Sequence, residues 1–131
     1  MCVALGGLGF AASLLESCST VPLIKASADN YKVSVPLKSF TKEKSFVIVR
    51  VASLDHDILL VKNSDGKYLG LNMVCTHQSQ PLSLSGNGLH CSAHGSSFDL
   101  EGNVTHAPAA IPLKRYTATL SGESIIIDLQ S

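Results

Sequence analysis

Two short Cys–His motifs constrain this chain more than any other feature of its sequence. Cys75-Thr-His77 and Cys91-Ser-Ala-His94 lie within the stretch "CTHQSQPLSLSGNGLHCSAHGSSFD", in which mostly small polar residues separate them. Each motif brings one thiol and one imidazole to the same short segment. Two cysteines alone could form a disulfide, but a histidine two or three residues after each cysteine favours metal binding. The sequence therefore predicts a metal centre held by two loops.

The remaining chain predicts an all-β fold in one domain. Its 131 residues are enough for a single core without disulfide staples. From Tyr31 onward, segments rich in β-branched residues recur about every ten residues and are separated by turn residues. Asp65-Gly66 predicts one hairpin and Ser121-Gly122 predicts another. We expect an antiparallel sandwich or open barrel, from which the metal-binding stretch projects as a two-loop subdomain.

The N-terminal segment predicts targeting or anchoring. Residues 3–15 are apolar and uncharged, too short for a membrane span of about 20 residues, but typical of a signal-peptide core. The cysteine that follows, Cys18, resembles the lipidated residue of a bacterial lipoprotein, which would place the domain at a membrane. The alternative is an ordinary apolar helix or uncleaved anchor. We expect residues 1–30 to be this segment and a linker, and residues 31–131 to be the folded domain.

Charge and composition exclude some functions. The formal net charge is zero and the chain has only two arginines, so no basic stripe is available for nucleic acid. No nucleophilic triad or carboxylate pair occurs at a plausible spacing. The composition of the predicted metal site leaves two alternatives: one zinc bound by Cys₂His₂, or a [2Fe–2S] cluster with two cysteines on one iron and two histidines on the other. The order of the ligands favours the cluster, because zinc fingers place a cysteine pair before a histidine pair, whereas here each motif supplies one ligand for each iron.

Three segments resemble the Rieske [2Fe–2S] proteins: "CTH", the pattern C-x-x-H-G-S-S-F-D, and the later "THAPAAIPLKRY", which is similar to the proline-containing loop that covers the cluster in that family. The resemblance spans residues 31–131. It implies one cluster per chain, with Cys75 and Cys91 on the buried iron and His77 and His94 on the outer iron. The imidazoles would raise the reduction potential, and their outer nitrogens would titrate with redox state.

The sequence departs from the respiratory members of that family at three positions. Those proteins carry two further cysteines that join the loops, where this chain has Gln80 and Ala93. Ser96 matches a serine that donates a hydrogen bond to a bridging sulfide, but Phe98 replaces a tyrosine that donates to a cysteine sulfur. With one donor kept and one lost, we expect an intermediate potential within the family range of about −150 to +300 mV.

The resemblance implies one-electron transfer rather than catalysis, because all four cluster ligands come from the protein and no iron position is open to substrate. An oxygenase catalytic domain would need a further iron site, for which the chain has no room. We expect a membrane-anchored or periplasmic carrier that exchanges electrons with a quinol-oxidising complex, a dehydrogenase or a cytochrome. The alternatives are a cytoplasmic ferredoxin of a multicomponent oxygenase and a structural zinc module.

Overall fold

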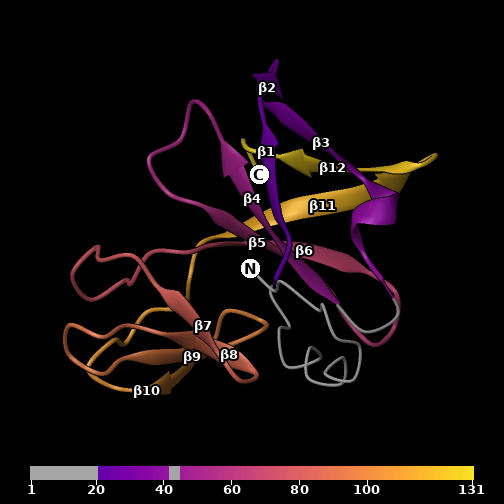
Figure 1. The fold of residues 1–131 in the computed structure, drawn as a ribbon. Helices are drawn as coiled ribbons and strands as arrows, with labels where there is room; N and C mark the ends of the chain where they lie inside the picture. The colour runs from indigo at the N-terminus through magenta and orange to yellow at the C-terminus, as the bar shows by residue number, and fades with distance from the viewer. Residues whose placement is uncertain (1–20, 42–44) are drawn as a thin grey trace, which may run out of the picture.

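The structure, a computed structural model, describes residues 21–41 and 45–131, and within them it is built of β-strands and loops with one short 3₁₀ turn. Figure 1 shows a large, strongly curved sheet with a smaller sheet beneath it. The large sheet contains β1 (Leu23–Ala26), β2 (Ala28–Asp29), β3 (Lys32–Pro36), β4 (Phe46–Val51), β5 (Ile58–Lys62), β6 (Tyr68–Asn72), β11 (Arg115–Ser121) and β12 (Ser124–Asp128). The small sheet contains β7 (Ser83–Ser85), β8 (Gly88–His90), β9 (Ser97–Asp99) and β10 (Val104–His106).

The large sheet curls into a nearly closed barrel. Its strand order is β1-β4-β5-β6-β11-β12-β3-β2, so β1 and β2 lie at opposite edges. Only Ser27 separates these two strands along the chain, and β1 also contacts β3. The segment from Leu23 to Asp29 therefore joins the two edges. All pairs in the sheet are antiparallel except β1 with β4, which is parallel. The all-β fold and both predicted hairpins are confirmed.

Two edge strands lie before residue 31, where the sequence predicted an apolar segment and a linker. Strands β1 and β2 fall within residues 1–30 and join the large sheet. Both are edge strands whose residues are half-buried or exposed, so their sequence lacks the strong apolar alternation that marks β3 and β4. The apolar segment 3–15 and Cys18 lie outside the described residues. The described residues form no helix with the length and apolarity that crossing a membrane requires.

Two apolar clusters fill the fold, one inside the barrel and one between the barrel and the small sheet. Strand β5 belongs to both. Ile58 and Leu60 lie in the barrel cluster, whereas Leu59 and Val61 lie in the other, and all four are buried. Side chains alternate between the two faces of a strand, so a strand covered on both faces has a continuous apolar run. This shared strand couples the small sheet to the barrel.

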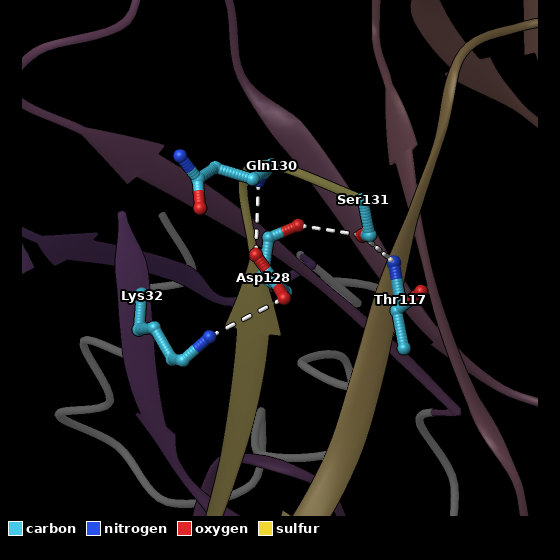
Figure 2. Close-up of polar contacts among 5 residues, drawn as sticks. All are labelled: Lys32, Thr117, Asp128, Gln130 and Ser131. Atoms are coloured by element: carbon cyan, nitrogen blue, oxygen red, sulfur yellow. Dashed lines mark hydrogen bonds and ion pairs between the residues drawn. The ribbon is translucent and has the colours of Figure 1, made fainter. Parts of the chain in front are cut away.

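The C-terminus is fastened to the sheet by polar contacts (Figure 2). The Asp128 carboxylate accepts hydrogen bonds from the Lys32 ammonium group at 3.3 Å and from the Gln130 backbone amide at 2.9 Å. The Ser131 hydroxyl donates to the Asp128 carbonyl and accepts the amide of Thr117 on β11, each at 2.8 Å. These bonds tie the chain end to Lys32 on β3 and to Thr117 on β11 beyond the last strand.

The small sheet carries the two Cys–His motifs on its connections. In Figure 1 the β6–β7 and β8–β9 connections, which carry the two Cys–His motifs, extend from it on the same side. Its strand β7 was not predicted from the sequence. Gly88 pairs with Asp99, and a Cβ at Gly88 would lie 2.5 Å from the Phe98 carbonyl oxygen. Only glycine allows β8 to approach β9 so closely.

Candidate metal centre

The first Cys–His loop begins at Cys75 and is closed by two backbone hydrogen bonds. The Cys75 amide donates to the Gln80 carbonyl at 2.8 Å, and the Cys75 carbonyl accepts the Ser79 amide at 2.8 Å. Val74 and Pro81 form a bridge at the base of the loop. This tight turn fixes the path of the backbone from Cys75 to Gln80, which includes His77.

The second loop repeats the same backbone design sixteen residues later. The Cys91 amide donates to the Ser96 carbonyl at 2.8 Å, and the Cys91 carbonyl accepts the Gly95 amide at 3.0 Å. The fourth residue after each cysteine is left-handed, with φ of 88° at Gly95 and 55° at Ser79. The two loops are therefore structural equivalents, although the histidine lies one position later in the second.

The two cysteine side chains lie in the apolar cluster between barrel and small sheet. Cys75 and Cys91 are each 1% exposed and unpaired in disulfides. Burial raises the pKa of the Cys75 thiol, but hydrogen bonds from the amides of His77 and Gln78 and from the side chains of Cys91 and Ser96 outweigh it, so the pKa is lowered. The His77 amide lies 3.4 Å from the Cys75 sulfur. The site thus favours a thiolate at Cys75.

The two histidines lie together on the surface. Both His77 and His94 are exposed, their ring centroids are 5.2 Å apart, and the rings are nearly perpendicular, at 88°. Within the described residues, no three Cys, His, Asp or Glu side chains are arranged to hold a single metal ion. The four predicted ligands form two pairs instead: two buried thiols and two exposed imidazoles.

A third loop, between β10 and β11, covers the other two. Ser96 is completely buried, and its hydroxyl accepts the Ala109 amide at 3.0 Å. The Thr76 hydroxyl donates to the Ile111 carbonyl at 2.6 Å. This loop belongs to the segment "THAPAAIPLKRY" and leads directly into β11. Sequence reasoning did not identify Thr76, Ala109 or Ile111, because these contacts join residues 13 to 35 positions apart.

The remaining predicted positions have clear locations. Phe98 is 1% exposed and packs in the same apolar cluster as the cysteines. Gln80 and Ala93, which replace the linking cysteines, are both exposed. His90, adjacent to Cys91, has its Nδ1 3.1 Å from the Ser97 hydroxyl, which gives it a structural partner away from the two pairs.

A barrel with a small loop-bearing sheet, and two equivalent loops that each pair a cysteine with a histidine, define the Rieske class of iron–sulfur proteins. The sequence model of the Rieske [2Fe–2S] domain matches residues 32–117, and the chain belongs to this family.

Relatives come from two functional settings. The chain is 31% identical over 80 residues to the cytochrome b6-f complex iron–sulfur subunit of Chlorobaculum thiosulfatiphilum, covering 60% of this chain and 44% of that subunit. The fold matches the cyanobacterial plasma membrane Rieske protein PetC3 of Synechocystis PCC 6803, with a TM-score of 0.61 and 24% identity. The match covers 72% of this chain and 97% of PetC3. It also matches the ferredoxin of Sphingomonas yanoikuyae B1, with a TM-score of 0.53 and 26% identity. This match covers 72% of this chain and 93% of the ferredoxin. The chain thus spans less than half of the length of the cytochrome b6-f subunit, and both solved structures share its fold.

Proposed function

We propose that Cys75, His77, Cys91 and His94 hold one [2Fe–2S] cluster, and that the chain carries single electrons between redox proteins. The observation that carries this proposal is the pairing of two buried thiols with two exposed imidazoles on equivalent loops. Thiolate and imidazole ligands on separate irons need two pairs, whereas one tetrahedral zinc needs four side chains at one point.

The protein's own residues prepare the site for that cluster, which when bound accepts and releases one electron. The apolar cluster around Cys75 and Cys91 excludes water from the sulfur side. The His77 amide donates a hydrogen bond to the Cys75 sulfur, and Ser96 also helps to lower the pKa of the Cys75 thiol, so both residues stabilise negative charge there. The exposed edges of His77 and His94 give a partner its shortest approach, because they are the only predicted ligands at the surface.

Metal content and reversible redox chemistry test this proposal. We expect two irons and two acid-labile sulfides per chain, a coloured oxidised protein, and a reduced state with an EPR signal. Cys75→Ser and His94→Asn should each lose this signal, whereas the control His90→Ala should keep it, because His90 faces Ser97. A colourless protein with one zinc per chain would support the structural zinc alternative.

We further infer that the carrier serves a membrane-associated or periplasmic chain with a quinol-oxidising complex, a dehydrogenase or a cytochrome as partner. The similarity to the cytochrome b6-f subunit and the apolar segment before Cys18 support this setting. The likeness to a ferredoxin supports the alternative of a soluble carrier for a multicomponent oxygenase. Cell fractionation separates them, because a soluble carrier does not sediment with the membranes. Mass spectrometry of the native N-terminus tests the lipid itself: a diacylated Cys18 supports anchoring by a lipid, and an intact Met1 excludes lipidation at Cys18.

A further inference from the structure

We propose that this carrier recognises its redox partner by apolar contact centred on Ile111 and not by charge, so that the partner offers an uncharged, apolar docking surface. The inference rests on the proposed function, because it takes the histidine edge as the point of electron exchange. We name the surface the docking face and define it by six exposed residues: His77, His94, Ala107, Pro108, Ala110 and Ile111.

Ile111 is the most exposed large apolar side chain among the described residues, with 63% of its surface accessible. A single exposed aliphatic residue is common on protein surfaces. Ile111 differs because exposed Ala110 and Pro112 flank it and because its carbonyl accepts the Thr76 hydroxyl at 2.6 Å. Thr76 lies between the two predicted ligands of the first loop. This bond therefore holds the Ile111 backbone against the first Cys–His loop, where the Ile111 side chain is exposed.

The docking face is held in place before any partner arrives. The Ala109 amide donates to the buried Ser96 hydroxyl at 3.0 Å, and Thr76 fixes the same loop two residues further on. The His77 and His94 rings are in contact. Three loops thus form one surface through bonds within the protein. Binding to a preorganised surface loses less conformational entropy, so a modest apolar contact is enough for a transient encounter.

Charge is absent from this part of the chain. Residues 68–98 and 102–113 contain no Asp, Glu, Lys or Arg, and they include the first two loops and all of the third loop except its last residue, Lys114. Two cations stand where the third loop meets β11, and both have local partners: Lys114 lies 5.0 Å over the Tyr116 ring, and Arg115 donates to the Glu101 carbonyl and to Asn103. A face without charge gives no electrostatic steering, so salt should have little effect on the rate of association with a partner.

Electron self-exchange between oxidised and reduced holoprotein tests the proposal, with a second copy of the chain as the uncharged apolar probe. One copy loses an electron and the other gains it, so the reaction is balanced without another reagent. NMR line broadening in mixtures of the two states gives the rate. We expect the wild-type rate to change by less than about twofold between low and high salt. Ile111→Ser should slow exchange by roughly fivefold or more, the loss expected when an isoleucine contact is removed.

Two further variants sharpen the test. Leu120→Ser removes another exposed aliphatic side chain, 49% accessible, near the far end of β11, and should leave the rate unchanged. Ile111→Lys should slow exchange at low salt and recover partly at high salt, since two like charges would then meet. Each variant must keep the wild-type spectrum and reduction potential, which shows that the cluster is intact.

The proposal is overturned if Ile111→Ser exchanges at the wild-type rate with its cluster intact, or if the wild-type rate depends strongly on salt. Neither result affects the proposed function, which requires only a reversible one-electron couple. Loss of that couple in the wild-type protein would instead contradict the proposed function itself.

Discussion

The hydroxyl of Ser96 accepts a hydrogen bond from the amide of Ala109 at 3.0 Å and helps to lower the pKa of the Cys75 thiol, so one buried side chain joins the covering loop to the predicted cluster site. The bond from Ala109 uses the hydroxyl oxygen as acceptor and leaves the hydroxyl proton free to donate toward sulfur. Ser96 therefore has a structural role and an electronic one.

Replacing Ser96 with alanine should change both the potential and the stability. Each hydrogen bond to sulfur favours the reduced, more negative cluster, so Ser96→Ala should lower the midpoint potential. A loss of about 1.4 kcal/mol corresponds to about 60 mV for one electron. The variant also leaves the Ala109 amide buried without a partner, which costs about 1–3 kcal/mol of stability. Protein-film voltammetry and denaturant unfolding measure the two effects.

The matched control is Ser97→Ala, which removes the neighbouring hydroxyl that bonds His90. It should leave the potential within a few tens of millivolts of wild type. An equal drop in both variants would contradict a specific role for Ser96.

Phe98→Tyr should raise the potential. The resemblance places a sulfur-bonding tyrosine hydroxyl at this position, and Phe98 lies in the same buried cluster as the cysteines. The wild-type protein should have an intermediate potential within about −150 to +300 mV, and the variant a higher one. Voltammetry of both proteins checks this expectation. A wild-type value at either extreme would show that counting these donors does not predict the potential.

Ser79→Gly should stabilise the first loop. Ser79 has φ of 55°, whereas its equivalent in the second loop is Gly95. A left-handed conformation costs a residue with a Cβ about 1–2 kcal/mol, and glycine loses part of this gain through its larger unfolded-state entropy. We expect a net increase of up to about 1 kcal/mol in the free energy of unfolding, measured by denaturant titration. The reverse change, Gly95→Ser, should destabilise the protein by a comparable amount.

Asp99 should make folding stability dependent on pH in the acidic range. Burial raises its pKa, but the amides of Asn103 and Glu101, the Asn103 side chain and the charge of Arg115 outweigh burial, and the pKa is lowered. A carboxyl whose folded pKa is depressed stabilises the protein above its unfolded pKa, and this contribution is lost as pH falls through the folded value. Asp99→Asn should therefore be less stable than wild type at pH 7, and the difference should shrink below about pH 4.

Unfolding curves at several pH values measure that difference. Asp65, in the exposed β5–β6 turn, provides a control, Asp65→Asn, that removes a carboxylate elsewhere. A difference between wild type and Asp99→Asn that stays constant down to pH 2 would contradict the role of the Asp99 charge.

The sequence predicted the β fold and the paired motifs because both depend on residues that are close together in the chain. Turn pairs such as Asp65-Gly66 and the spacing of Cys and His residues can be read directly from the chain. The edge strands β1 and β2 could not be predicted, because their half-exposed residues carry weak alternation. Strand β7 is only three residues long. The bonds of Ser96 to Ala109 and of Thr76 to Ile111 join loops that only the folded chain brings together.

Mössbauer spectroscopy of protein enriched in ⁵⁷Fe tests most directly whether two buried thiols and two exposed imidazoles hold two different irons. Upon one-electron reduction we predict two equal, distinct iron signals, one ferric and sulfur-ligated by Cys75 and Cys91, and one ferrous and nitrogen-ligated by His77 and His94. Two irons with the same all-sulfur environment, or a protein that binds no iron, would contradict the account.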